Sequence, residues 1–333
     1  MSMTAWRYRH SRRRAMLAAA AATVAYRLPA FAEGTPQPAE WMVAAQLELP
    51  RSEYPATVLD GKIYVAGGFG AESSFDRYDP EADAWERLPD LPEPRHHLAL
   101  AGLDGAIYLA GGLTGVSHSA EANFWRFDPE ALAWETLEPL PQGPRGSLGA
   151  GVIDGVIYVV GGSANDLSGP ATSDLARYDP VEARWDLLEP MPTSREHVGV
   201  GVAAGMLIAV GGRDGGHETT AMLEATERYD PASGTWSAGA PMPTRRAGLG
   251  VASGGDAIFA IGGERFLDGE AVTLAAVERY DPVSDAWTQL PDLPVARHGV
   301  AAAWVDQSLY AIGGSIAAGT VMNVRTVDRI QAE

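Results

Sequence analysis

One short unit recurs six times along the 333-residue chain, and this repetition restricts the fold more than any other feature. Each unit contains a Gly-Gly pair after an apolar run, and the pairs lie at 67–68, 111–112, 161–162, 211–212, 262–263 and 313–314. An arginine precedes every pair by 16 residues, namely Arg51, Arg95, Arg145, Arg195, Arg246 and Arg297. A period of 44 to 51 residues indicates one supersecondary unit per repeat, packed against its neighbours.

The rest of the unit predicts four short strands. An aromatic-Asp-Pro step follows five of the pairs, and a Trp lies seven residues after each aromatic; these residues are Tyr78 and Trp85, Phe127 and Trp134, Tyr178 and Trp185, Tyr229 and Trp236, and Tyr280 and Trp287. In the third unit we expect the first strand at 146–152 and the second at 156–160, joined by an Asp-Gly step typical of tight hairpins. The third strand ends at the aromatic-Asp-Pro step because Pro stops strand pairing, and the fourth begins at the Trp.

In this order, the Gly-Gly, aromatic-Asp-Pro and Trp motifs resemble the kelch repeat, and the resemblance covers roughly residues 41–331. It implies an all-β fold, a six-bladed kelch β-propeller with one four-stranded blade per repeat around a central channel. We expect blades at about 51–90, 95–139, 145–190, 195–241, 246–292 and 297–331, with 41–49 added to the last one. Residues 33–333 are then a single domain.

The two ends of the repeat region predict how the ring closes. The sixth unit stops without a Trp strand, whereas Trp41 precedes Arg51 by ten residues, the same distance as Trp85 from Arg95. Residues 41–49 are therefore expected to supply the fourth strand of the C-terminal blade, which removes the exposed edges of an open sheet.

Residues 1–32 are expected to be a signal peptide. They contain six Arg and no acidic residue, with an Arg-rich block at 11–14, an Ala-rich apolar run at 15–26 and a small-x-small end at 30–32. The adjacent arginines resemble a twin-arginine signal, so we expect cleavage near Ala32 and a periplasmic or secreted protein. The alternative is an N-terminal anchor, but a run of 12 residues is short for a bilayer. No later segment approaches that length, so we expect no membrane span after cleavage.

Charge and the absence of Cys exclude several classes of function. Residues 33–333 carry 43 acidic and 19 basic side chains, a formal charge of −24, which argues against nucleic acid as a partner. With no Cys there is no disulfide, no thiolate ligand for zinc and no thiol nucleophile. No Gly-x-Gly-x-x-Gly motif leads from a strand into a helix, so we expect no nucleotide cofactor.

Candidate binding residues gather where two connections of each repeat meet, just after the Arg and just after the Gly-Gly pair. Six of the twelve slots that follow the arginines are ionisable, on strands that are otherwise small and apolar. The ligand-binding candidates are Glu53, Tyr54, Phe69, His96, His97, Ser147, Glu196, His197, Arg213, Asp214, His217, Glu264, Arg265 and His298. They predict a polar pocket at the channel mouth. The alternative is that these residues are polar only because the ends of loops are exposed to solvent. The arginine series itself is expected to be a scaffold that bonds carbonyls between neighbouring blades.

Loop lengths single out the first blade. Its connection after the Gly-Gly pair is about six residues shorter than the others, which predicts a notch in the rim. Glu53, Tyr54, Phe69, His96 and His97 would border this notch, and we expect a ligand to enter there.

The resemblance favours an exported binding module that recognises a glycan, a peptide or a protein on its loop face, rather than an enzyme. The alternative is a periplasmic carbohydrate mutarotase or epimerase, because exported six-bladed kelch propellers include the N-acetylneuraminate epimerases. No catalytic residue carries over by motif; Glu196, His197 and Glu264 are the acid/base candidates, and Arg213 would hold a substrate carboxylate.

A copper oxidase and a metal site are both disfavoured. Galactose oxidase, another kelch propeller, has seven blades and a Tyr–Cys crosslink, whereas this chain has six repeats and no Cys. We expect no metal and no other cofactor, because no His pair at helical spacing exists and His96, His97, His197 and His298 come from three different units.

Overall fold

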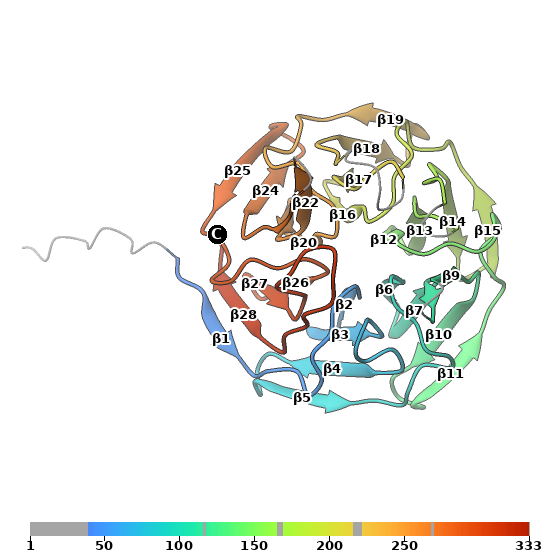
Figure 1. Cartoon of the computed structure of the whole chain (residues 1–333). Helices are drawn as coiled ribbons and strands as arrows, with labels where there is room; N and C mark the ends of the chain where they lie inside the picture. Colours follow the sequence, from blue (N-terminus) through green and yellow to red (C-terminus); the bar gives the residue numbers. More distant parts are fainter. Residues whose placement is uncertain (1–38, 116–117, 165–168, 216–221, 268–269, 333) are drawn as a thin grey trace, which may run out of the picture. The chain divides into compact units, whose positions relative to one another are not determined.

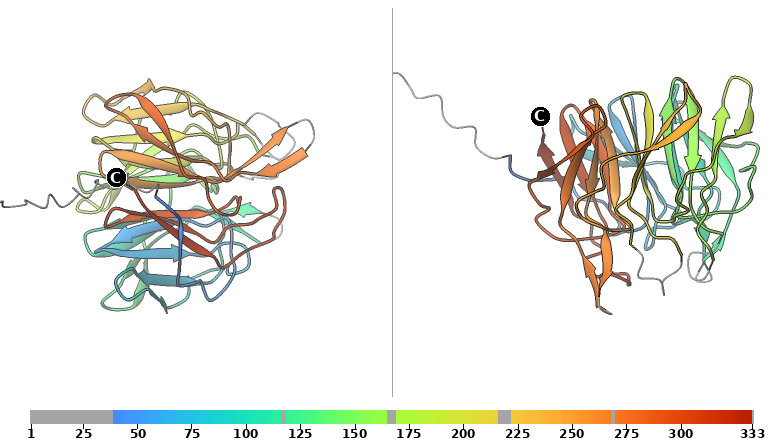
Figure 2. Two further views of the ribbon diagram at one scale, coloured as in Figure 1. Left: turned by 90° about the vertical axis from the view of Figure 1, so that its left-hand side faces the viewer. Right: turned by 90° about the horizontal axis from the view of Figure 1, so that it is seen from above.

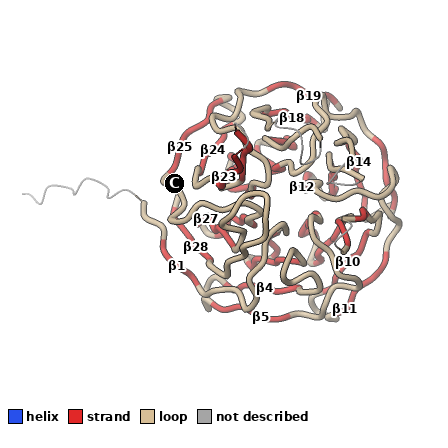
Figure 3. The backbone as a smooth tube through the Cα atoms, viewed as in Figure 1, coloured by secondary structure: helices blue, strands red, loops and turns tan. Residues whose placement is uncertain are grey.

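The computed structural model describes residues 39–332 except 116–117, 165–168, 216–221 and 268–269. These residues form six four-stranded antiparallel sheets, which follow one another around a ring in sequence order (Figure 1). The described part of the chain consists of strands and loops and contains no helix (Figure 3). The prediction of an all-β, six-bladed propeller is confirmed. The expected signal peptide at 1–32 lies outside the described residues.

The first three blades run from the inner to the outer strand in chain order. Blade 1 contains β2 (Ala56–Leu59), β3 (Lys62–Ala66), β4 (Phe75–Asp79) and β5 (Ala84–Arg87). Blade 2 contains β6 (Ala99–Leu103), β7 (Ala106–Ala110), β10 (Phe124–Asp128) and β11 (Ala133–Thr136). Blade 3 contains β12 (Gly149–Ile153), β13 (Val156–Val160), β14 (Leu175–Asp179) and β15 (Arg184–Leu187).

The remaining blades repeat this order, with one exception at the closure. Blade 4 contains β16 (Gly199–Ala203), β17 (Met206–Val210), β18 (Thr226–Asp230) and β19 (Thr235–Ala238). Blade 5 contains β20 (Gly250–Gly254), β21 (Ala257–Ile261), β24 (Val277–Asp281) and β25 (Ala286–Leu290). Blade 6 contains β26 (Ala301–Val305), β27 (Ser308–Ile312), β28 (Val327–Gln331) and β1 (Met42–Ala44).

Two small hairpins extend the connections that follow the Gly-Gly pairs. They are β8 (Leu113–Thr114) with β9 (Ser119–Ala120), and β22 (Glu264–Leu267) with β23 (Glu270–Thr273). The β22–β23 hairpin projects from one face of the ring (Figure 2). We call this face, onto which the connections after the Gly-Gly pairs open, the loop face.

Small residues on the innermost strands let the blades approach the channel axis. A Cβ added to Gly149 would lie 2.1 Å from Val200 Cγ2 of the next blade, and one added to Gly199 would lie 2.4 Å from Val251 Cγ2. Side chains at these positions would collide with the neighbouring strand, so the Gly- and Ala-rich pattern is a packing requirement.

The N-terminal strand closes the ring as predicted. β1 pairs with β28 in antiparallel register, with Met42 opposite Arg329 and Ala44 opposite Val327. The Tyr54 hydroxyl of blade 1 donates a 2.7 Å hydrogen bond to the Ile312 carbonyl of blade 6. The first and last parts of the described chain therefore share one sheet, and β1 covers the outer edge of β28 (Figure 1).

The tryptophan series makes one contact in every blade. Each indole Nε1–H donates to a carbonyl in the linker that leaves the preceding blade. The bonds are Trp41 to Pro291 at 3.0 Å, Trp85 to Ala45 at 2.8 Å, Trp134 to Pro89 at 3.5 Å, Trp185 to Glu138 at 3.0 Å, Trp236 to Glu189 at 2.9 Å and Trp287 to Ala240 at 2.9 Å. Trp41 thus makes the same contact for blade 6 that the other tryptophans make for blades 1 to 5.

The arginine series is structural, but its side chains bond within their own blade rather than between blades. All six are at most 2% exposed. Four pair with a carboxylate two residues before the aromatic position of the same blade: Arg51 with Asp76, Arg195 with Glu227, Arg246 with Glu278 and Arg297 with Asp328. In blade 2 this position holds Trp125, whose ring lies 5.0 Å from the Arg95 guanidinium, and in blade 3 it holds Ala176. The link between blades comes from the arginine carbonyls, for example Gly314 N–H to Arg51 O at 2.8 Å.

Asp285 offers a test of how the outer turns depend on pH. Tyr280 Oη donates to Asp285 Oδ1 at 2.5 Å, and the Ala240 N–H donates to the same oxygen at 2.7 Å. These two bonds lower the pKa of Asp285 below its ordinary value of 3.8. Because the folded protein favours the ionised form of Asp285, the ionised carboxylate stabilises the fold. This stabilisation is complete above pH 3.8 and is lost as the pH falls through the lowered pKa of Asp285. We expect Asp285→Asn to be less stable than wild type at pH 7, with the difference shrinking towards pH 3.

Thermal unfolding of both proteins from pH 7 to pH 3 measures this effect. Glu130→Gln, a change in the exposed turn of blade 2, serves as the control and should track wild type at every pH. A difference for Asp285→Asn that stays constant over the whole range would contradict the assignment.

Candidate functional site

A ring of six backbone hydrogen bonds surrounds the loop-face end of the channel. In each blade, the N–H of the residue two places after the Arg donates to the carbonyl of the equivalent residue in the preceding blade, at 2.7–3.3 Å. The ring residues are Glu53, His97, Ser147, His197, Gly248 and Gly299. Because the last bond runs from Glu53 N to Gly299 O, the ring is continuous around the axis.

Every residue of this ring has a left-handed backbone, with φ between 49° and 58°. Glycine adopts this conformation freely, and two blades use it. The other four positions hold Glu53, His97, Ser147 and His197, at a cost of about 1 kcal/mol each. Strained polar residues of this kind cluster at functional sites, where the surrounding structure holds them in place.

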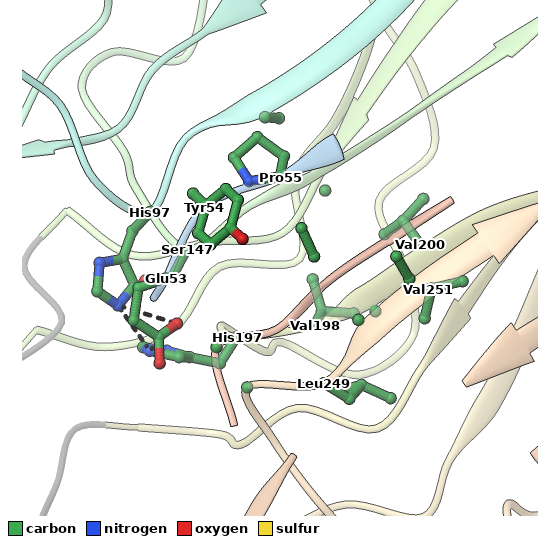
Figure 4. Close-up of a pocket in the computed structure, with 18 of the residues that line it drawn as sticks. Glu53, Tyr54, Pro55, His97, Ser147, His197, Val198, Val200, Leu249 and Val251 are labelled. Atoms are coloured by element: carbon green, nitrogen blue, oxygen red, sulfur yellow. Dashed lines mark hydrogen bonds and ion pairs between the residues drawn. The ribbon is translucent and has the colours of Figure 1, made fainter. Parts of the chain in front are cut away.

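Three of these side chains converge on one point (Figure 4). His97 Nε2 lies 3.0 Å from His197 Nε2, and Glu53 Oε2 lies 3.4 Å from His97 Nε2 and 3.9 Å from His197 Nε2. They come from blades 1, 2 and 4, so the ring brings together residues as far as 144 positions apart in the sequence. We call Glu53, His97 and His197 the axial triad.

A second layer of buried polar residues holds the axial triad from the loop side. The residue after each Arg forms a bridge with the residue after the Gly-Gly pair of the same blade, as Glu196 does with Arg213. Glu196 accepts hydrogen bonds from His197 Nδ1 and from Arg213 Nε. On the other side, His298 Nε2 lies 3.4 Å from Glu53 Oε1. Glu264 completes the layer, with carboxylate oxygens 3.7 Å from Arg213 Nη1 and from His298 Nε2.

Burial and the neighbouring charges shift the pKa values of the axial triad in different directions. Burial raises the pKa of Glu53 above 4.5 in spite of the nearby imidazoles. Burial, together with His197 and His96, holds the pKa of His97 well below 6.5. For His197, burial and Arg213 act to lower the pKa, but the Glu196 and Glu53 carboxylates outweigh them and raise it. At neutral pH the site therefore holds a neutral His97 next to an imidazole that accepts a proton readily.

The structure gathers most of the predicted site residues and leaves three outside the cluster. The gathered residues are less than a tenth exposed; they are His96, His97, Ser147, Glu196, His197, Arg213, Glu264 and His298. Asp214 and Arg265 are exposed. Tyr54 is buried, and its hydroxyl bonds blade 6. His217 lies outside the described residues.

Side chains occupy the rim beside the short loop of blade 1, where the sequence predicted a notch. Phe69 stacks on His96 with ring centroids 4.2 Å apart and also contacts His118, 5.5 Å away. Asn323 Nδ2, from blade 6, donates a 2.6 Å hydrogen bond to the Phe69 carbonyl.

The channel continues beneath the ring as a cavity of about 130 Å³. Its wall becomes mostly apolar one residue deeper in each blade. Tyr54 lines it in blade 1, and the other five blades contribute Leu98, Leu148, Val198, Leu249 and Val300. Ser147 also lines it, and the Ser147 Oγ makes no hydrogen bond to any described residue.

Sequence reasoning missed the role of two glycines. A Cβ on Gly299 would lie 2.6 Å from Glu53 Oε1, and one on Gly248 would lie 3.8 Å from the same atom. These two positions leave the space that the Glu53 carboxylate occupies. The available signal was the presence of Gly in slots where four other blades carry larger side chains.

Replacing Ser147 by Gly should stabilise the protein. The change removes the cost of a left-handed non-glycine residue, about 1 kcal/mol, and also removes a buried hydroxyl without a partner. Denaturant unfolding of Ser147→Gly should therefore show a higher midpoint than wild type. The matched control is Ser52→Gly, also buried but at a position without a left-handed backbone, which should lower the midpoint. Equal shifts in the two variants would contradict the strain argument.

Comparison with known proteins agrees with this architecture. Residues 63–323 match the family described as the Attractin/LZTR1 beta-propeller, and the chain belongs to that propeller family. The solved "Structure of YjhT" superposes with a TM-score of 0.73 at 17% identity, covering 87% of this chain and 96% of that one, which shows the same fold.

Curated relatives include kelch-like proteins. The Kelch-like protein terF of Aspergillus terreus is 28% identical over 182 residues, which cover 53% of this chain and 39% of the relative. Kelch-like protein 36 of Bos taurus is 30% identical over 161 residues, which cover 47% of this chain and 25% of the relative. Beta-scruin of Limulus polyphemus is 30% identical over 169 residues, which cover 49% of this chain and 18% of the relative. The chain thus spans well under half the length of these relatives. It is a kelch-type propeller, a class whose members typically act as protein-interaction modules.

Among the described residues, no helix is long and apolar enough to cross a membrane.

Proposed function

We propose that this chain is an exported binding module that takes a polar group of a glycan, a peptide or a protein into the loop-face end of its channel. The observation that supports this most is the strained ring, where Glu53, His97, Ser147 and His197 occupy positions that glycine would fill without cost. A scaffold that needed only to close its ring could use Gly in all six blades, as it does in two.

The chemistry of the site favours a ligand that both donates and accepts hydrogen bonds. The Glu53 and Glu264 carboxylates accept, the histidines do either according to their protonation, and Arg213 Nη1 is a buried donor without a hydrogen-bond partner in the described residues. Hydroxyl-rich sugars and peptide ends both present such groups. A contact made only by exposed loops would instead use residues such as Asp214 and Arg265.

Binding measured by saturation-transfer NMR tests the proposal. The probes are N-acetylglucosamine, N-acetylneuraminic acid and a mixture of tripeptides, each added to wild type, Glu53→Gln and Arg265→Gln. We expect at least one probe to bind wild type and Arg265→Gln but not Glu53→Gln. Binding that depends on Arg265 and not on Glu53 would move the site to the exposed loops, and absence of binding by all probes would count against a small-group pocket.

Export forms a separate part of the proposal and depends on the Arg-rich, Ala-rich segment at 1–32. Cell fractionation with N-terminal sequencing of the mature protein tests it. Cleavage near Ala32 and loss of export when Arg12 and Arg13 are both replaced by Lys are the expected results. A protein that stays in the cytoplasm with residues 1–32 intact would contradict it.

The second candidate is a carbohydrate mutarotase or epimerase. It is favoured by Glu53 and His197, a carboxyl with a raised pKa 3.9 Å from an imidazole with a raised pKa, which can exchange a proton with a sugar hydroxyl. Anomer exchange of N-acetylneuraminic acid, followed by NMR with and without protein, tests this activity. Exchange that is faster with wild type but not with Glu53→Gln would support it, and equal rates with and without protein would exclude it for this sugar.

A further inference from the structure

The geometry points to a binding site for one divalent transition-metal ion, with zinc as the reference case, between Glu53 Oε2, His97 Nε2 and His197 Nε2. These three atoms, each from a different blade, are mutually close enough to be ligands of one cation. The site lies at the loop-face end of the channel, at the level of the strained ring. The inference does not depend on the ligand proposed above, although it uses some of the same residues.

The spacing of the three atoms fits a metal better than it fits hydrogen bonds. The separations from Glu53 Oε2 to the two imidazole nitrogens, 3.4 and 3.9 Å, exceed the usual N–H···O range. With the 3.0 Å separation of the two nitrogens, they define a point about 2.0 Å from all three atoms, the length of Zn–N and Zn–O bonds. A hydrogen-bonded imidazole pair would account for the two nitrogens but not for the carboxylate beside them.

The outer ring nitrogens of both imidazoles have hydrogen-bond partners, and the partner of His197 is a carboxylate, as is usual for metal-bound histidines. His197 Nδ1 donates to the Glu196 carboxylate, so its Nε2 is left to face the axis. His97 Nδ1 lies 2.5 Å from His96 Nδ1, and His96 Nε2 lies 3.5 Å from the Gly115 carbonyl. With the His96 proton on Nε2, its Nδ1 accepts from His97 Nδ1–H, which leaves the lone pair of His97 on Nε2, the atom next to His197 Nε2 and Glu53 Oε2. Both imidazoles are thus held in the tautomer that a metal requires.

The donor set and the open side define the class of ion. Two imidazoles and one carboxylate suit Zn²⁺ and other borderline cations rather than Ca²⁺ or Mg²⁺, which prefer all-oxygen sites. Three ligands leave a fourth position, and the cavity beneath the ring adjoins it, with the unpartnered Ser147 Oγ in its wall. Glu53, Glu196 and Glu264 place three carboxyl groups in the site beside a single guanidinium, that of Arg213.

This inference departs from the expectation that the chain holds no metal. That expectation followed from the absence of ligand pairs at short spacing, but the ring supplies the ligands from residues 53, 97 and 197. Proton transfer by His197 and metal binding at its Nε2 exclude one another, so the metal content also bears on the second candidate function.

Zinc titration of the full chain, made metal-free with a chelator and followed by calorimetry, tests the site. We expect one equivalent of zinc to bind wild type and to raise its unfolding temperature. Glu196→Gln removes an outer partner of His197 and should lower the zinc affinity by about 10–100-fold. His97→Gln and His197→Gln each remove a ligand and should lower the zinc affinity by more than this. His118→Gln, a neighbouring imidazole outside the axial triad, should match wild type.

Zinc K-edge X-ray absorption of the wild-type complex provides a measurement that no variant's folding can confuse. Two imidazoles in the first shell are expected. No stoichiometric binding by wild type, binding that survives both His97→Gln and His197→Gln, or a first shell without imidazole would each overturn the proposal. Zinc binding without binding of any sugar or peptide probe would contradict the proposed function and support the metal site. Binding of a probe without zinc binding would support the proposed function and contradict the metal site.

Discussion

Glu227→Gln is expected to lower the free energy of unfolding by about 3–5 kcal/mol, a large part of the stability of a typical domain. Glu227 forms an ion pair with Arg195, and these two side chains are 8% and 0% exposed. It also accepts a 2.6 Å hydrogen bond from Thr193 Oγ1. The neutral amide leaves the Arg195 guanidinium buried without an opposite charge, and burial already lowers the pKa of Arg195. Urea unfolding at pH 7, followed by tryptophan fluorescence, measures the loss.

Two further variants separate charge from packing. Glu182→Gln removes an exposed carboxylate that pairs with Arg184, both more than half exposed, and should change stability by about 1 kcal/mol or less. The double variant Arg195→Met with Glu227→Leu removes both buried charges and should recover most of what Glu227→Gln loses. If the double variant is less stable than Glu227→Gln, the guanidinium matters for its hydrogen bonds to the Gly211 and Ala225 carbonyls rather than for its charge.

The fold was predictable because each repeated motif encodes the same contact in every blade. The Trp positions were recognisable because every indole of the series bonds the preceding linker, including Trp41, whose spacing from Arg51 predicted the closure. The Gly-Gly pairs were recognisable because both glycines of each pair have positive φ. A contact that is made in all six blades requires the same residue type at a regular spacing, and such a spacing can be recognised in a single sequence.

The buried carboxylates escaped sequence reasoning because their periodicity is broken. Asp76, Glu227, Glu278 and Asp328 share one position, but Trp125 and Ala176 interrupt the series in two adjacent blades. Because the carboxylates were not recognised as a repeated position, the arginines could be assigned to the scaffold but not to their correct partners. In blade 3, Arg145 has no carboxylate at this position, and its Nη1 lies 3.8 Å from the partly exposed Asp174 carboxylate instead.

The candidate site was predictable as a set of residues but not as an arrangement. Placing Glu53, His97 and His197 in equivalent slots indicated that they lie at one level of the channel. Their convergence depends on a left-handed backbone at each slot and on the space above Gly248 and Gly299, neither of which spacing reveals. Asp214 and Arg265, chosen by the same loop argument, are exposed because they lie one residue beyond the bridged positions.

Deletion of residues 41–47 is expected to remove cooperative unfolding of the propeller. The deletion removes β1, the Trp41 bond to Pro291 and the side chain of Leu47, which is 2% exposed. Lost apolar burial and strand hydrogen bonds amount to roughly 5–10 kcal/mol, comparable to the whole stability of a domain. The deletion also leaves the outer edge of β28 unpaired, so the variant should aggregate as well as unfold at a lower temperature. Calorimetry and light scattering measure the two effects.

A peptide of residues 39–49 added to this variant distinguishes loss of closure from general damage. If β1 acts by pairing with β28, the peptide should bind the open edge and restore a cooperative transition, because the lost contacts do not depend on chain connectivity. The same peptide with Trp41→Ala lacks the indole bond to Pro291 and should restore less. An unchanged sharp transition in the deletion variant without peptide would show that five complete blades and three strands of the sixth hold the ring by themselves.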